Sequence, residues 1–207
     1  MIRLKNIAVL ASGEGTNLQA IMDAVDKGRI VGKIVLVISD VREARALVRA
    51  KAKEIKALFL NPKEYRERED YDRALVAELK REKVDLVVMA GFMRLLSSVM
   101  IDAFQGKIIN IHPSLLPSFP GCEGVRQALD HGVKITGCTV HFVDEGLDTG
   151  PIIIQESVPV LQNDTVETLQ QRIHSAEHRI YTRAIDLFCR NMIEVKGRRC
   201  FICEKER

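Results

Sequence analysis

Two segments carry polar side chains that could do proton-transfer chemistry. In N-I-H-P-S-L-L-P, residues 110–117, Asn110 and His112 stand two positions apart at the end of an apolar run. Because side chains alternate along a strand, both face the same side. An amide beside an imidazole can stabilise a developing oxyanion and move a proton. We therefore predict that this pair is catalytic rather than structural.

The second segment, H-F-V-D-E-G-L-D-T-G-P, contains Asp144, Glu145 and Asp148. These acids could form a solvated loop, or hold a metal ion, although no calcium-loop pattern is present. Alternatively, one carboxylate orients His112 and keeps it charged, because an anion beside an imidazole favours the protonated ring. This last interpretation requires a tertiary contact.

A glycine-containing segment, S-G-E-G-T-N at residues 12–17, lies between a predicted strand and a predicted helix. Gly13 and Gly15 allow close backbone approach, and a helix start attracts anions, so we predict a phosphate site. The alternative is a plain tight turn with Thr16 as N-cap. Leu18 stands where a dinucleotide fingerprint needs its third glycine, and the Gly-Lys-Ser/Thr of a P-loop is missing.

A fourth segment, G-F-M-R-L-L at residues 91–96, combines apolar side chains with Arg94. Such a group suits a flat heteroaromatic ligand with a polar edge. A helix entry that packs into the core is an equally open interpretation.

The elements that position these segments follow from hydrophobic periodicity. We predict strands over residues 7–12, 33–39, 57–60, 84–90, 107–111, 135–143 and 151–158, and helices over residues 17–27, 42–53, 65–82, 95–104, 124–131 and 165–190. The pattern predicts an α/β fold: one doubly wound, mostly parallel sheet with helices on both faces, ending in a helix and a short hairpin at residues 192–203. We expect a single domain, residues 1–207, with ligands at the carboxyl ends of the strands.

The last helix has start signals of its own. Asp164 and Thr165 are N-cap candidates, and Glu167 stands three residues after Asp164, as in a capping box. An apolar stripe along this helix is predicted to pack on the sheet, formed by Leu169, Ile173, Ile180, Ala184 and Leu187.

Composition excludes several functions. The 207 residues carry 31 basic and 28 acidic side chains, a net charge of +3. This balance predicts no nucleic-acid and no membrane partner, and no signal peptide opens the chain. Five cysteines indicate reduced thiols in the cytoplasm, not a disulfide framework. The Cys200/Cys203 and His174/His178 pairs are only weak metal signals, so no metal is expected.

The chain resembles the phosphoribosylglycinamide formyltransferases, the folate-dependent family of purine synthesis, over nearly its whole length. The most specific pieces are N-I-H-P-S-L-L-P and G-C-T-V-H-F-V-D-E-G-L-D-T-G-P. The resemblance implies a formyltransferase-like Rossmann variant. It implies an enzyme that moves a formyl group from 10-formyltetrahydrofolate to the amine of 5-phosphoribosylglycinamide, in de novo purine biosynthesis. It implies small-molecule substrates, no metal, and a cytoplasmic monomer or homodimer.

The same resemblance implies three groups of site residues. The catalytic group is Asn110, His112 and Asp148. The ribonucleotide contacts are Gly13, Gly15, Thr16, Asn17 and Glu177. The formyl-folate contacts are Arg68, Met93, Arg94, Leu95, Leu96, Asn110, Val143 and Asp144.

The chain departs from the family pattern at C-E-G-V, residues 122–125, where many relatives carry histidines, and at Asp40, where Asn is common.

Three other functions stay open. A methionyl-tRNA formyltransferase would add an RNA-binding domain, and a 10-formyltetrahydrofolate hydrolase would add a regulatory domain; we expect neither in 207 residues. A non-catalytic nucleotide-binding module would not need Asn110, His112 and Asp148.

Overall fold

The computed structural model of the chain describes residues 3–203. The chain forms two compact units, Met1–Ile109 and Asn110–Arg207. The division after Ile109 falls within strand β5 (Ile108–His112). The single domain over residues 1–207 stays a prediction.

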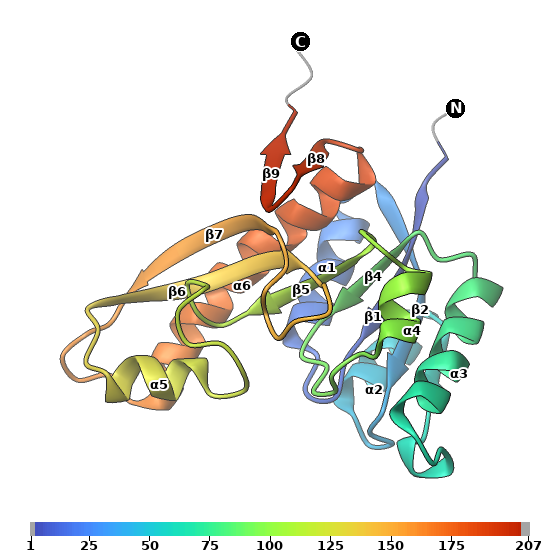
Figure 1. Ribbon diagram of the computed structural model, residues 1–207, viewed down its shortest axis with the longest axis horizontal. Helices are drawn as coiled ribbons and strands as arrows, with labels where there is room; N and C mark the ends of the chain where they lie inside the picture. The colour runs from blue at the N-terminus through green and yellow to red at the C-terminus, as the bar shows by residue number, and fades with distance from the viewer. Residues whose placement is uncertain (1–2, 204–207) are drawn as a thin grey trace. The chain divides into compact units, whose positions relative to one another are not determined.

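The first unit contains a parallel sheet with strand order β3-β2-β1-β4. Its elements are β1 (Lys5–Leu10), α1 (Thr16–Asp26), β2 (Gly32–Ser39), α2 (Arg45–Ala52), β3 (Ala57–Phe59), the 3-10 helix η1 (Pro62–Glu64), α3 (Arg68–Arg81), β4 (Leu86–Met89) and α4 (Ser98–Ala103). Helices α1 and α2 lead the chain outward from β1 to β3, and α3 returns it to β4. Right-handed crossovers therefore place α1 and α2 on one face and α3 on the other. Helix α4 packs beside α3 (Figure 1).

The core of this unit explains why the strands are continuous apolar runs. Residues 7–11, 36–38 and 86–88 have no exposed surface. A parallel sheet covered by helices on both faces buries every side chain of its central strands, so the polar-apolar alternation of a half-exposed strand is absent.

The second unit has the strand order β6-β7-β9-β8. Its elements are α5 (Gly124–Asp130), β6 (Ile135–Phe142), β7 (Ile152–Pro159), α6 (Val166–Cys189), β8 (Ile193–Lys196) and β9 (Arg199–Ile202). The β6–β7 and β8–β9 pairs are antiparallel, and β7 pairs with β9 in parallel. Helix α6 packs on β6 and β7, and α5 packs beside α6 (Figure 1). The predicted fold class, including the final helix and hairpin, is confirmed.

All predicted strands and helices are present, but three helices begin three residues later than predicted. Helix α2 begins at Arg45 rather than at residue 42, and α3 begins at Arg68 rather than at residue 65. Before α3, the side chain of Asn61 accepts a hydrogen bond from Lys63 N and starts the separate helix η1. The periodicity predicted one helix because this 3-10 turn does not interrupt the apolar pattern.

The third shift affects residues 95–97, which belong to a loop instead of the start of α4, so that α4 begins at Ser98. Ser97 is the N-cap, in extended geometry. Its backbone N and its Oγ both donate to Asp72 Oδ2, at 2.6 and 2.7 Å, and Asp72 is 1% exposed. This buried carboxylate holds the chain outside the helix up to Ser97, so the segment 91–96 is a loop.

Helix α6 is capped differently from the prediction. Its N-cap is Thr165, which forms a capping box with Thr168, not with Glu167. Asp164 lies outside the helix and pairs with Arg172 at 2.8 Å. The predicted apolar stripe is confirmed, since all five of its residues are buried: Leu169, Ile173, Ile180, Ala184 and Leu187.

Candidate active site

The second unit brings the three predicted catalytic residues together. His112 Nδ1 lies 3.4 Å from Asp148 Oδ2, and the two side chains are 5% and 10% exposed. Asp148 Oδ2 also accepts a hydrogen bond from Gly121 N at 2.9 Å. Asn110, which lies on the same strand as His112, joins this cluster through its contact with His141. Asp148 and His112 thus form the tertiary contact that is required if a carboxylate of the acidic loop orients His112.

The other ring nitrogen of His112 faces a carbonyl. His112 Nε2 lies 2.8 Å from Phe119 O, and because a carbonyl only accepts, Nε2 is the donor. The charged ring can donate at both nitrogens, to Phe119 O and toward Asp148. The Nδ1 contact is longer than the roughly 2.7–2.9 Å of a full charge-assisted bond.

The loop that carries Phe119 is held by buried and partly buried hydrogen bonds. Thr139 Oγ1 donates to Ser114 O at 2.7 Å and accepts from Leu116 N at 3.0 Å. Gln155 Nε2 donates to Leu116 O at 2.9 Å and to Thr139 Oγ1 at 2.9 Å. Buried hydrogen-bonded networks of this kind fix local geometry. The carbonyl opposite His112 therefore belongs to a rigid loop.

His141 also belongs to this cluster, although it is not among the three predicted catalytic residues. It is 2% exposed, and its Nδ1 lies 2.8 Å from Phe142 O. Its Nε2 lies 3.4 Å from Asn110 Nδ2 and 3.7 Å from Asp148 Oδ1. Burial lowers the pKa of His141, which favours the neutral ring. In the sequence, the hint that His141 belongs to the site was its position in the same segment as Asp148.

The remaining acids of the 143–148 loop have separate roles. Asp144 Oδ1 accepts from Thr149 Oγ1 at 2.6 Å and from Gly146 N at 3.1 Å, so this side chain shapes the loop. Val143 is half-buried, and Glu145 is exposed. Among residues 3–203, no three His, Cys, Asp or Glu side chains gather as a metal site would require.

In the first unit, the segment 12–17 forms a turn into helix α1. The N-cap is Gly15, at φ 70°, and Thr16 is the first helical residue, so the alternative of Thr16 as N-cap is wrong. A Cβ on Gly15 would lie 2.9 Å from Ala46 Cα, and Ala46 N donates to Gly13 O. Helix α2 therefore packs directly on the glycine turn. No side chain caps α1, and a helix start of this kind suits an anion.

Ser12 connects this turn to two other strand ends. Its Oγ donates to Asp40 Oδ1 at 2.6 Å and accepts from Met93 N at 3.0 Å, and its backbone N donates to Gly91 O. One side chain thus joins the glycine turn, the end of β2 and the 91–96 loop. The sequence showed Ser12 in the motif but not its partners.

The 91–96 loop exposes part of its apolar group. Met93 is 72% and Leu95 59% exposed, whereas Phe92 is buried. The guanidinium of Arg94 lies over the Tyr71 ring, 4.8 Å from its centroid. Two large apolar side chains at the carboxyl end of a parallel strand contradict the interpretation of a helix entry packed into the core.

The other predicted contact residues lie on two helices. Arg68 is the first residue of α3, half-exposed and 3.7 Å from Glu69. Glu177 lies on α6 and is 4% exposed.

Neither weak metal signal gains support. His174 and His178 stack on α6 with ring centroids 6.4 Å apart. Cys200 lies on strand β9 and Cys203 follows it, with both thiols free. Three residues of extended chain span about 10 Å, beyond the roughly 7 Å limit for a disulfide.

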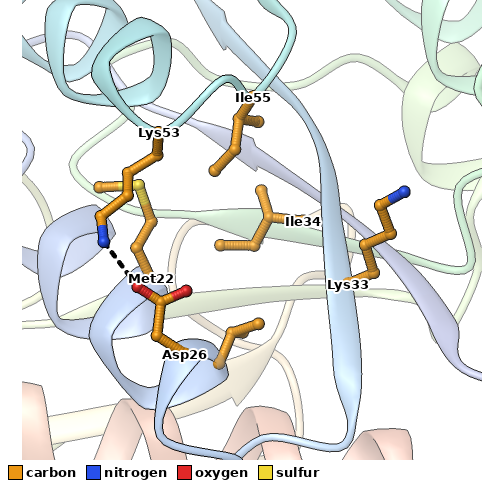
Figure 2. Close-up of a pocket in the computed structure, with 7 residues that line it drawn as sticks. Met22, Asp26, Lys33, Ile34, Lys53 and Ile55 are labelled. Carbon is orange, nitrogen blue, oxygen red and sulfur yellow. Dashed lines mark hydrogen bonds and ion pairs between the residues drawn. The ribbon is translucent and has the colours of Figure 1, made fainter.

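A pocket of about 170 Å³ in the first unit belongs to no predicted site (Figure 2). It lies beside the end of α1 and the start of β2, at the amino ends of the strands. Met22, Ile34 and Ile55 line it, and an ion pair between Lys53 and Asp26, at 2.6 Å, lies beside them. Ligands of such sheets bind at the carboxyl ends of the strands, where the glycine turn and the 91–96 loop lie.

Residues 5–185 match the formyl transferase family, and the chain belongs to this family. It is 43% identical to a phosphoribosylglycinamide formyltransferase of Bacillus subtilis over 88% of this chain and 93% of that protein. It is 42% identical to the trifunctional purine biosynthetic protein adenosine-3 of Homo sapiens, but spans 20% of that longer protein. The crystal structure of glycinamide ribonucleotide transformylase 1 from Symbiobacterium toebii matches 97% of this chain and 95% of its own, with 52% identity and a TM-score of 0.96. The chain is therefore an enzyme of the formyltransferase type.

No helix among residues 3–203 is long and apolar enough to cross a membrane.

Proposed function

We propose that this enzyme transfers the formyl group of 10-formyltetrahydrofolate to the amine of 5-phosphoribosylglycinamide. The products are formylglycinamide ribonucleotide and tetrahydrofolate, in de novo purine biosynthesis. The observation that carries the proposal is the buried contact between His112 and Asp148, 3.4 Å apart, with Asn110 on the same strand. We further propose a cytoplasmic monomer or homodimer, with no metal and no nucleic-acid partner.

The chemistry is a direct attack of the substrate amine on the formyl carbon. A C–N bond forms to the ribonucleotide amine, the formyl oxygen takes up negative charge, and the bond to folate N10 then breaks. Asn110 and His112 donate hydrogen bonds to this oxyanion. His112 donates to the oxyanion through its Nδ1–H, because the contact of this nitrogen with Asp148 is long.

Asp148 has two tasks in this scheme. Its carboxylate faces His112 Nδ1 at 3.4 Å and orients the ring. It also helps move the proton lost by the amine toward N10 of the departing tetrahydrofolate, directly or through a water. The Gly121 N–H bond to Oδ2 keeps the carboxylate oriented.

The proposed binding residues fall into two groups, one for each substrate. For the ribonucleotide, the glycine turn with the α1 N-terminus takes the phosphate, and Glu177 contacts the end that carries the amine. The turn comprises Gly13, Gly15, Thr16 and Asn17. For the formyl-folate, the exposed apolar side chains of the 91–96 loop support the choice of this loop. The folate contacts are Arg68, Met93, Arg94, Leu95, Leu96, Asn110, Val143 and Asp144.

The test mixes purified protein with 10-formyltetrahydrofolate, with and without 5-phosphoribosylglycinamide, and follows pterin absorbance. We expect deformylation only when both substrates are present, with formylglycinamide ribonucleotide as product. Deformylation without the ribonucleotide would identify a hydrolase. Ribonucleotide binding without any turnover would identify a non-catalytic module.

A further inference from the structure

The orientation of the Asn110 amide matters because its two ends are chemically opposite. The nitrogen end donates hydrogen bonds, and the oxygen end only accepts them. An oxyanion needs a donor, so a flipped amide would repel it. Something in the structure must therefore select the nitrogen end.

His141 has the hydrogen-bonding state required for that selection. Its Nδ1 lies 2.8 Å from Phe142 O, and since a carbonyl cannot donate, Nδ1 carries a hydrogen. The ring is 2% exposed, and burial lowers its pKa, so the ring stays neutral. A neutral imidazole has one N–H, so Nε2 bears a lone pair and can only accept.

The contact between His141 and the Asn110 amide then favours one orientation of the amide. Asn110 Nδ2 lies 3.4 Å from His141 Nε2, and Asp148 Oδ1 lies 3.7 Å from the same nitrogen. Both are acceptors. An amide oxygen turned toward Nε2 would face its lone pair without any hydrogen between them, which is costly in a buried site.

We propose that His141 is a positioning residue that accepts one N–H of Asn110 and thereby leaves the second N–H to donate to the formyl oxygen. This inference rests on the proposed function and deepens it. His141 does not touch the reacting atoms and exchanges no proton with them. Its contribution is to fix which end of the Asn110 amide the substrate meets.

Two variants of His141 separate positioning from packing. His141→Phe keeps a ring but removes the acceptor, whereas the side-chain oxygen of His141→Gln can accept in place of Nε2. We expect His141→Phe to lower kcat by about 10- to 100-fold, the order of loss when a group that orients a functional side chain is removed, with KM nearly unchanged. His141→Gln should recover most of that loss.

A double-mutant cycle distinguishes this role from a purely structural one. In an Asn110→Ala background, the amide that His141 orients is gone, so adding His141→Phe should cost little further kcat. Equal losses in both backgrounds would overturn the proposal. Thermal unfolding midpoints of each variant show whether the fold is retained.

Nitrogen-15 NMR of the histidine rings in the wild-type enzyme tests the premise without any turnover. The five histidines of the chain give separate ring signals, and the set missing from His141→Gln belongs to His141. At neutral pH we expect a protonated Nδ1 and an unprotonated Nε2. A protonated Nε2 would overturn the proposal. If the protein transferred no formyl group but showed this tautomer, the proposed function would fail and the Asn110–His141 contact would stand.

Discussion

The glycine turn of the first unit and the histidine cluster of the second differ in their proposed task and in the chemical groups that form them. The turn is built from main chain: Gly15 at φ 70°, a helix start without a side-chain cap, and Ala46 packed against it. The cluster is built from side chains, with His112, His141 and Asp148 each nearly buried and each in polar contact. An anion site thus depends on backbone shape, and a proton-transfer site on side-chain identity.

The difference sets where each region tolerates change. A substitution that preserves the backbone should spare the turn, and one that preserves shape should still destroy the cluster if it alters charge or hydrogen bonding. Each of the following variants tests one side of this comparison.

The largest effect is expected in the cluster. His112→Ala should lower kcat by about 100- to 1000-fold, the usual cost of removing a donor to an oxyanion. Asp148→Asn should lower kcat by about 100-fold or more, because it removes a group that moves a proton. Asp148 has φ 54°, a region that Asn tolerates well, so Asp148→Asn changes the charge without straining the backbone. Steady-state kinetics with both substrates measure the loss.

The matched control is Glu145→Gln, which neutralises an exposed acid of the same loop. It should leave kcat unchanged. Near-normal turnover of Asp148→Asn would remove Asp148 from the mechanism.

The next effect is expected in the turn. Gly15→Ala places a methyl group 2.9 Å from Ala46 Cα and puts a non-glycine residue at positive φ, which costs roughly 1–2 kcal/mol. We expect a lower unfolding midpoint and a clearly raised KM for the ribonucleotide, because the turn must shift. Kinetics at varied ribonucleotide concentration and thermal unfolding measure the two effects.

Gly28→Ala is the control for backbone strain. Gly28 has φ +66°, but its Cβ would meet nothing within 4 Å. It should lower stability similarly and leave KM unchanged. An equal rise of KM in both variants would show that general destabilisation, not the turn, determines ribonucleotide affinity.

A smaller effect is expected at Ser12, where the turn depends on a side chain. Ser12→Ala removes the bonds to Asp40 and to Met93 N. A hydrogen bond to a charged group contributes about 1.5–3 kcal/mol, so both neighbouring loops should loosen. We expect KM to rise for the ribonucleotide and the formyl-folate together. Ser175→Ala removes a hydroxyl bonded only to its own helix and should change neither. A rise for one substrate only would contradict the coupling.

The smallest effect lies outside both regions. Thr165→Ala removes the N-cap of α6 and should lower the free energy of unfolding by about 1 kcal/mol. Activity should stay unchanged. Denaturant unfolding gives the difference, and Thr182→Ala, at a hydroxyl within the same helix, is the comparison. A loss of turnover in Thr165→Ala would show that α6 contributes to catalysis through its start.

Much of the fold could be predicted because local patterns coincide with burial. The runs at residues 7–11 and 86–88 are buried on both faces, and the stripe of α6 is buried where its period predicts. The start of α4 could not be predicted, since it depends on Asp72, which is 25 positions from Ser97 in the chain. The 3-10 turn before α3 was missed because one short turn leaves the apolar period intact.

By itself, the sequence determined the alternation of strands and helices, the glycine turn before α1, and the side that Asn110 and His112 share, because all three depend on neighbours within a few residues. The tertiary structure alone decided that Asp148 meets His112, that Phe119 O occupies the second nitrogen of that ring, and that His141 faces Asn110. These contacts join residues on separate strands and loops, and sequence spacing does not encode such distances. A hydrogen-bonding role depends on the partner as well as the residue, and only the folded chain supplies the partner.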